Sequence, residues 1–109
     1  MKNVKAKPHK ELIINGKYSE FGDFYDKNKE LIYKSIIDLF SEFKTTRKKV
    51  LQLYIWSKIQ GLEWDTEFNF KKEDSIVLTR DIMPYFEEIE DYEMCDKILK
   101  LYKELTKSK

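Results

Sequence analysis

The last third of the chain, residues 81–105, restricts the fold more than any other stretch because it has the pattern of two helices joined by a short break. An acidic segment leads into the run Glu90-Asp91-Tyr92-Glu93, and apolar residues then recur at helical spacing. The apolar positions of this final helix are Met94, Cys95, Ile98, Leu101, Tyr102 and Leu105. The sequence therefore predicts a helical hairpin with an acidic side, a shape suited to binding another protein.

Two further helices are predicted upstream of the hairpin. Residues 22–43 place large apolar side chains at helical spacing and so favour a first long helix. A second helix is predicted from a threonine cap at residue 45 or 46 to Gly61, a residue favoured just past a helix end. Residues 50–56 inside it are apolar almost all round, which indicates a helix buried at the centre of the domain.

The acidic half of the hairpin is predicted as a third helix, over residues 75–89, with Ile82, Phe86 and Ile89 on its apolar face. Pro84 interrupts this pattern because proline lacks the backbone N–H that a helix interior needs. Either the helix kinks at Pro84, or it begins near Asp81 with Pro84 in its first turn.

Two stretches fit extended backbone. Residues 12–14 are apolar and lead into Asn15-Gly16, a strong turn signal, so a short N-terminal β-hairpin or extended segment is predicted there. Residues 62–70 alternate loosely between apolar and polar positions, which is typical of a strand with one buried face. The expected fold class is mainly α: about four helices in a small bundle, with these two extended segments beside it.

Length and composition indicate one small domain. With 109 residues and 41% hydrophobic side chains, the chain can form a single core without disulfides or metals. Residues 1–10 are basic and lack periodicity, which predicts a flexible tail ahead of one helical domain over residues 11–109. The single cysteine, the lack of a signal peptide and the lack of a long apolar run favour a cytoplasmic protein without a membrane partner. Abundant Lys, Ile, Glu, Tyr and Asn suit an AT-rich bacterial or phage genome.

The residue pattern does not favour an enzyme. His9, the only histidine, falls in the basic tail, and no candidate base stands near Cys95, which we expect to be a buried structural thiol. The chain has no Gly-rich phosphate loop and no Cys/His metal spacing. The acidic segment lacks the glycine spacing of a calcium loop. We therefore expect no catalytic residues, no metal and no cofactor.

Charge clusters give two candidate interaction sites. Seven acids and no base fall between Asp81 and Asp96, in a chain with a formal net charge of +1. The predicted partner-binding residues are Glu87, Glu88, Glu90, Asp91, Tyr92 and Glu93. A basic cluster at the start of the predicted second helix gives the alternative, nucleic-acid-binding set: Lys44, Arg47, Lys48 and Lys49. The first set favours another protein with a basic surface as the partner.

The hairpin also resembles a known family. Residues 81–105, with Glu90-Asp91-Tyr92-Glu93, the small Cys95 and apolar Ile98, look like the UVR motif. That motif is a helical hairpin of excision-repair proteins and Clp-protease adaptors, where it mediates protein–protein contacts. Its Arg-Asp pair is replaced here by Leu99-Lys100.

Taken with the charge pattern, these features predict a small non-enzymatic protein–protein interaction module, such as an adaptor, inhibitor or assembly factor, bacterial or phage-encoded. The alternative is a small nucleic-acid-associated protein that uses the basic tail and the basic cluster.

Overall fold

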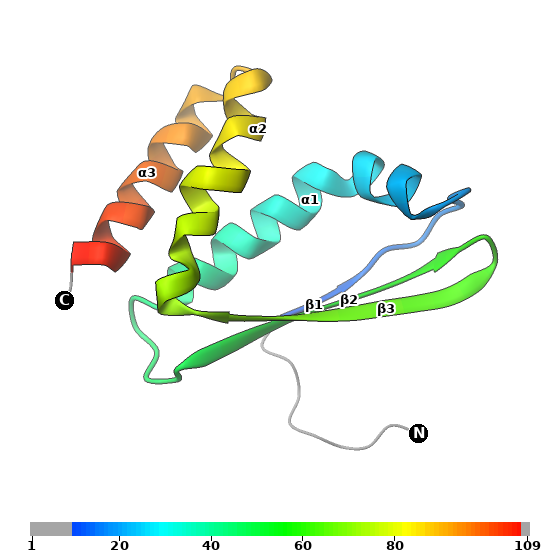
Figure 1. Ribbon diagram of the computed structural model, residues 1–109, viewed down its shortest axis with the longest axis horizontal. Helices are drawn as coiled ribbons and strands as arrows, with labels where there is room; N and C mark the ends of the chain where they lie inside the picture. Colours follow the sequence, from blue (N-terminus) through cyan, green and yellow to red (C-terminus); the bar gives the residue numbers. More distant parts are fainter. Residues whose placement is uncertain (1–9, 108–109) are drawn as a thin grey trace.

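The computed structural model describes residues 10–107 of the chain. Its elements are, in order, β1 (Lys10–Ile13), α1 (Phe21–Glu42), β2 (Val50–Ile59), β3 (Leu62–Lys71), the 3-10 turn η1 (Lys72–Ser75), the π-helical turn η2 (Leu78–Ile82), α2 (Met83–Glu88) and α3 (Tyr92–Lys107). The strands form one mixed sheet in the order β1-β2-β3, and the three helices lie on one side of it (Figure 1). The fold is therefore α+β, and the prediction of a mainly α four-helix bundle is wrong.

Strand β2 occupies the stretch that was predicted as the central helix. Its side chains alternate: Leu51, Leu53 and Ile55 are buried beneath the helices, whereas the residues between them are half-buried on the opposite face. Tyr54 and Trp56 belong to that opposite face, and both side chains combine apolar bodies with polar tips. Because both residues count as apolar, the alternation of buried and open positions in β2 was obscured in the sequence. The stretch therefore resembled a helix that is apolar all round.

A tight turn joins β2 to β3. The two strands pair antiparallel in an unbroken register from Val50 opposite Lys71 to Ile59 opposite Leu62. Gln60 and Gly61 fill the two-residue loop with φ angles of 57° and 77°, the positive values of a type I′ turn. Gly61 therefore serves a hairpin and not a helix end. The extended segment predicted over residues 62–70 is confirmed as β3.

Strand β1 pairs in parallel with β2, across the connection that contains α1. The Ile14 N–H extends this pairing by donating to the Trp56 carbonyl oxygen at 3.0 Å, and the buried Ser57 hydroxyl donates to the Ile14 carbonyl oxygen at 2.9 Å. The sequence predicted a short β-hairpin or an extended segment here. The extended segment is confirmed as β1, whereas the hairpin is wrong, because Asn15-Gly16 bends the chain toward α1 without returning a strand. A Cβ on Gly16, whose φ is 152°, would lie 2.7 Å from the Tyr18 hydroxyl oxygen.

One hydrophobic core joins the sheet to the helices. Helix α1 packs on β2, and α3 packs on α1, η1, η2 and α2. The largest side chains that are almost fully buried in this core are Phe24, Phe40, Phe86, Ile37, Leu39, Leu51, Leu53, Ile55, Leu78, Ile82 and Ile98. The helical layer thus covers only the inner face of the sheet, and no other element within residues 10–107 covers the outer face (Figure 1).

The segment before the final helix is helical throughout but changes type. The Met83 N–H donates to the Leu78 carbonyl oxygen, five residues back, and so closes the π-helical turn η2. Pro84 follows at the start of α2, where its missing N–H does not break an interior hydrogen bond. The sequence predicted either a kink at Pro84 or a helix that begins near Asp81 with Pro84 in its first turn. In the structure α2 begins at Met83 with Pro84 in its first turn, directly after the π-helical turn η2.

Two sequence predictions concern the ends and the membrane. Residues 1–9 of the predicted basic tail lie outside the described residues, whereas Lys10 begins β1. Within residues 10–107, no helix combines the length and the apolar character needed to cross a bilayer.

Candidate interaction surfaces

The predicted partner-binding residues lie together where α2 turns into α3, at the end of the hairpin that points away from the sheet (Figure 1). We call this set the acidic tip: Glu87, Glu88, Glu90, Asp91, Tyr92 and Glu93. Two backbone hydrogen bonds close the turn, from the Asp91 N–H to the Phe86 carbonyl oxygen at 2.9 Å and from the Glu90 N–H to the Glu87 carbonyl oxygen at 3.0 Å. This pattern is a Schellman motif, with Glu90 at the left-handed position with a φ of 61°.

The acids of the tip have two different roles. Asp91 is half-buried, and its carboxylate accepts a hydrogen bond from the Met94 N–H at 3.2 Å, which caps the start of α3. The four glutamates of the tip are exposed, and no ion pair joins them to another part of the described chain. The structure therefore gives Asp91 a capping role, whereas the glutamates are exposed and not ion-paired within the described residues.

Two apolar side chains lie exposed among these glutamates. Tyr92 is 65% exposed and Ile89 is 47% exposed. The sequence predicted Ile89 on the buried face of its helix, but α2 ends one residue earlier, at Glu88. The break that was predicted near Glu90 is the signal that places Ile89 in the turn. The tip thus combines a small apolar patch with surrounding carboxylates.

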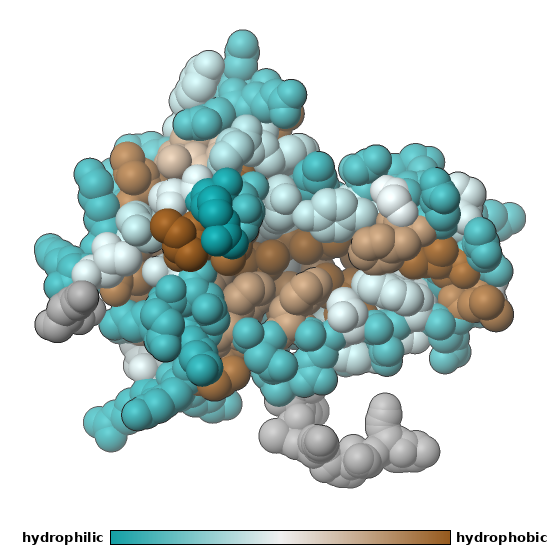
Figure 2. All heavy atoms as spheres, in the orientation of Figure 1, coloured by the Kyte–Doolittle hydropathy of each residue, from teal (hydrophilic) through white to brown (hydrophobic). Residues whose placement is uncertain are grey.

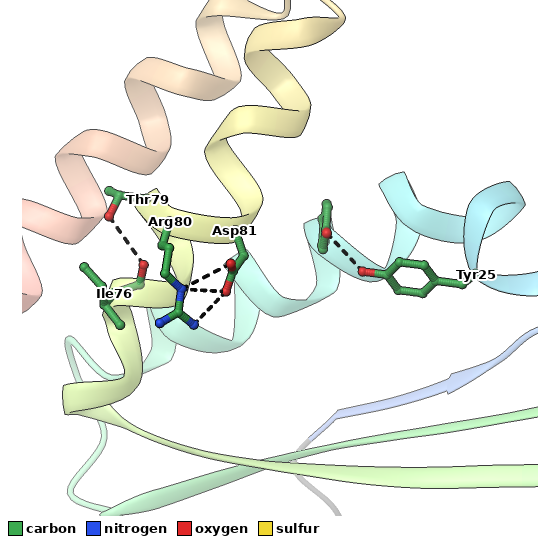
Figure 3. Close-up of polar contacts among 6 residues, drawn as sticks. Tyr25, Ile76, Thr79, Arg80 and Asp81 are labelled. Atoms are coloured by element: carbon green, nitrogen blue, oxygen red, sulfur yellow. Dashed lines mark hydrogen bonds and ion pairs between the residues drawn. The ribbon is translucent and has the colours of Figure 1, made fainter. Parts of the chain in front are cut away.

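The acidic segment is less charged at its two ends than the sequence suggests. The Arg80 guanidinium binds the Asp81 carboxylate through both Nε and an Nη, with a shortest distance of 2.8 Å (Figure 3). This hydrogen bond lowers the pKa of Asp81. Lys100 pairs with Asp96 at 3.2 Å. Bases just outside the segment therefore neutralise its ends and confine the unpaired negative charge to the tip.

Cys95 lies on α3 beside the acidic tip and is half-buried, packed against the core, whereas the sequence predicted a buried structural thiol. Burial, together with the negative charges of Glu87 and Asp91, raises the pKa of its thiol. A raised pKa lowers the thiolate fraction and with it the reactivity at neutral pH. His9 lies outside the described residues, and within residues 10–107 no group of three or more His, Cys, Asp or Glu side chains could hold a metal ion.

The alternative basic residues lie on the loop between α1 and β2. The sequence predicted them at the start of a helix, but the element that follows this loop is strand β2. Lys44 pairs with Glu104 at 3.1 Å, whereas Arg47, Lys48 and Lys49 are exposed. Those three line a cavity of about 290 Å³ together with Lys72 and the acidic Glu73.

Lys72 and Lys107 were not predicted as part of this site. Lys72 follows β3 in η1, and Lys107 ends α3. A neighbouring cavity is lined by Lys44, Lys72 and Lys107, so cations from three parts of the chain meet at one end of the molecule. We call this group, with the three exposed loop residues, the basic end. Only the fold could reveal it, because the loop cations, Lys72 and Lys107 are separated from one another by more than 20 residues in sequence.

The outer face of the sheet is a third surface, which the sequence analysis missed. Tyr54 and Trp56 lie half-buried on β2, and their partners across the strands are acidic: Glu67 stands opposite Tyr54 and Asp65 opposite Trp56. On the other side, Glu11 of β1 stands opposite Tyr54. The alternation in β2 was the signal that could have located this face, but a helical interpretation of the stretch excluded it.

Hydrogen bonds hold the polar side chains of this face in place. The Tyr54 hydroxyl donates to the Asp65 carboxylate at 2.7 Å, and the Gln52 side-chain amide donates to the Glu67 carboxylate at 3.0 Å. The hydrogen bond to Asp65 raises the pKa of Tyr54 to about 12, because it stabilises the neutral phenol. The face is therefore a pre-ordered surface of aromatic and acidic groups.

Comparison of the chain with family models, with curated proteins and with solved structures finds no match. The resemblance of residues 81–105 to the UVR motif accordingly stays a prediction.

Proposed function

We propose that this protein is a small non-enzymatic protein–protein interaction module, an adaptor, inhibitor or assembly factor that docks on a basic surface of another protein through its acidic tip. The observation that carries this proposal is that the apolar side chains of Tyr92 and Ile89 lie exposed at the same turn as four exposed glutamates. The protein contacts made by hairpins of the UVR motif point in the same direction.

Each part of the tip has a physical role in this proposal. Exposed carboxylates attract a basic surface over several ångströms and so raise the association rate and orient the partner. An exposed tyrosine offers a large contact area at a small cost in side-chain entropy, which suits it as the anchor of an interface. The Schellman turn holds these groups on a backbone that hydrogen bonds already define.

The test is affinity capture from host lysate with the full chain as bait. Reversing Glu87, Glu88 and Glu90 to lysine should leave the fold intact and reduce the yield of captured protein. The matched control reverses Lys48 and Lys49 to glutamate, which changes the charge at the basic end instead. Nuclease treatment of the lysate separates direct protein partners from those bridged by nucleic acid.

Two outcomes contradict the proposal. Capture of the same proteins at the same yield by the tip variant would show that the tip is not the binding site. Loss of capture in the Lys48 and Lys49 variant alone, or after nuclease treatment, would move the site to the basic end. Rising salt should slow association with a true partner, because exposed charges are screened beyond about 8–10 Å near physiological ionic strength.

A second candidate function is nucleic-acid binding at the basic end. The observation in its favour is that Lys72 and Lys107 join the loop cations around adjoining cavities. Several convergent cations are what phosphate binding requires. Fluorescence anisotropy with labelled single- and double-stranded oligonucleotides tests this function. Reversal of Lys48 and Lys49 should then weaken binding and reduce its salt dependence, whereas reversal of the tip should have little effect.

A further inference from the structure

Strand β3 has a free edge along which backbone groups remain available for hydrogen bonding. In a two-residue hairpin the residues that flank the turn, here Ile59 and Leu62, exchange two backbone hydrogen bonds. Along the two strands, pairs that exchange such bonds then alternate with pairs that do not. The N–H and C=O groups of the intervening residues therefore point away from β2, and these residues are Glu63, Asp65, Glu67 and Asn69. No described backbone group outside the sheet bonds to them.

Lys71, the next residue with an outward-facing N–H, shows where the free edge ends. Its N–H donates a hydrogen bond to the Asp74 carboxylate at 2.7 Å, at the start of η1. The open edge thus extends from Glu63 to Asn69. At roughly 3.3 Å per residue it is about 20 Å long, which accommodates a strand of five to seven residues.

The inner side of this edge is apolar and incompletely covered. Phe68 is 40% exposed, and Trp64 and Phe70 are half-buried, although all three belong to the face that the helices cover on β2. The Phe68 and Phe70 rings stack with centroids 6.2 Å apart. Figure 2, which looks onto the β3 side, shows hydrophobic side chains left visible between the sheet and the helical layer. A further strand beside β3 would cover them.

The outer side of the same edge is acidic. Glu63, Asp65 and Glu67 are exposed at alternate positions and lie on the open face of the sheet. Lys58 stands opposite Glu63, but the other two carboxylates face Trp56 and Tyr54. An added strand would place its own alternate side chains next to these carboxylates. Basic side chains at those positions would be favoured, and acidic ones would be repelled.

A second copy of this chain does not fit the edge. If β3 paired with its own symmetry mate about a two-fold axis centred anywhere from Asp65 to Glu67, at least one carboxylate would stand directly opposite another. Like charges in cross-strand positions are destabilising, and edge charges are a known protection against self-association. The charge pattern therefore selects a strand of opposite charge from a different protein.

We propose that β3 accepts an extended segment of a partner protein as a fourth strand of the sheet, in which basic residues alternate with large apolar residues. The basic residues lie on the outer face beside Glu63, Asp65 and Glu67. The apolar residues lie on the inner face, where they cover Phe68 and the rings next to it. Backbone hydrogen bonds to the free edge supply affinity, and the alternation supplies specificity.

The probe for this proposal is a nine-residue synthetic peptide in which lysine and valine alternate, labelled for fluorescence anisotropy and added to the full chain. One control peptide has the same composition with the lysines and valines in separate blocks, and another carries glutamate in place of lysine. Only the alternating basic peptide should bind tightly. Amide hydrogen exchange should slow at Glu63, Asp65, Glu67 and Asn69 when it binds, because these N–H groups become donors to the peptide.

Two variants test the edge: Asp65→Pro changes the backbone and one carboxylate together, and a triple reversal changes the charges alone. Asp65→Pro removes one outward N–H and the carboxylate that accepts from the Tyr54 hydroxyl, but no backbone hydrogen bond to β2, so the hairpin should fold while peptide affinity falls about tenfold or more. Reversal of Glu63, Asp65 and Glu67 to lysine should exchange the preference, so that the glutamate peptide binds and the lysine peptide does not. Circular dichroism and thermal melts confirm that each variant folds.

Three results would overturn the proposal. The block peptide could bind as tightly as the alternating one, which would show that charge attraction, and not strand pairing, accounts for the binding. Asp65→Pro and the triple reversal could both retain wild-type affinity. Sedimentation could show a dimer that Asp65→Pro dissolves, which would make a second copy the occupant.

A variant of the acidic tip distinguishes failure of this strand proposal from failure of the proposed function. Reversal of Glu87, Glu88 and Glu90 should leave affinity for the alternating peptide unchanged, because the tip lies at the far end of the α2–α3 hairpin. If the peptide fails to bind but the tip reversal still abolishes capture from lysate, the strand proposal fails and the proposed function stands. If the peptide binds and the tip reversal has no effect on capture, the strand proposal stands and the proposed function fails.

Discussion

Replacing Glu90 with glycine should stabilise the protein, although it removes a whole side chain. Glu90 occupies the left-handed position of the Schellman turn between α2 and α3, with a φ of 61°. A side chain with a Cβ is strained in that conformation, whereas glycine adopts it readily. The hydrogen bonds that close the turn come from the backbone and remain in the variant.

The size of the effect follows from two opposing contributions. Relief of the left-handed conformation is worth roughly 1–2 kcal/mol for a non-glycine residue. The greater conformational freedom of glycine in the unfolded chain offsets about 0.4–1 kcal/mol of this gain. The net gain in the free energy of unfolding should therefore lie between 0 and about 1.6 kcal/mol, centred on about 0.8 kcal/mol. For a domain of about 100 residues, a gain of about 0.8 kcal/mol corresponds to an increase in melting temperature of roughly 3–6 °C.

The assay is chemical denaturation followed by circular dichroism, supported by thermal melts. Glu90→Gln is the matched control, because it removes the charge but keeps the backbone strain, and it should gain much less than Glu90→Gly. If the glycine variant is no more stable than the glutamine variant, the turn is not strained at Glu90 and the reasoning is refuted.

Three other measurements test the fold and its electrostatics. Leu53→Ala should cost roughly 2–5 kcal/mol in denaturation experiments, because Leu53 is fully buried on the inner face of β2; a loss below about half a kcal/mol would contradict that placement. Cys95 should react slowly with a thiol reagent at neutral pH, and Glu87→Gln should speed the reaction by lowering the raised pKa; an unchanged rate would refute the influence of Glu87. The pKa of Tyr54 should lie near 12 in an ultraviolet titration, and Asp65→Asn should lower it toward 10.0, so the stability that this hydrogen bond provides is present below pH 10.0 and is lost as the pH rises toward 12.

The helices were predictable because their evidence is local. In α1 and α3, apolar side chains recur every three or four residues, and the predicted limits lie close to those observed. The hydrogen bonds of a helix join neighbouring residues, so the sequence of the segment itself carries most of the information. The hairpin of α2 and α3 was predicted for the same reason.

The sheet was missed because its evidence is distant in sequence. The four residues of β1 pair with β2 some 40 residues later, and no local pattern names that partner. In β2, Tyr54 and Trp56 suit either a helix core or the open face of a sheet, since each side chain is both apolar and polar. Gly61 likewise fits a helix end or a type I′ turn.

The candidate sites divide in the same way. The sequence by itself determined where the acids and bases are concentrated, and it placed the glutamates of the acidic tip at a helical turn. Only the tertiary structure decided that Lys44 pairs with Glu104 and that Lys72 joins the basic end. It also decided that β3 has a free edge between an acidic face and an apolar one. The physical reason is that charge belongs to each residue, whereas pairing, burial and exposure depend on which distant segments come together.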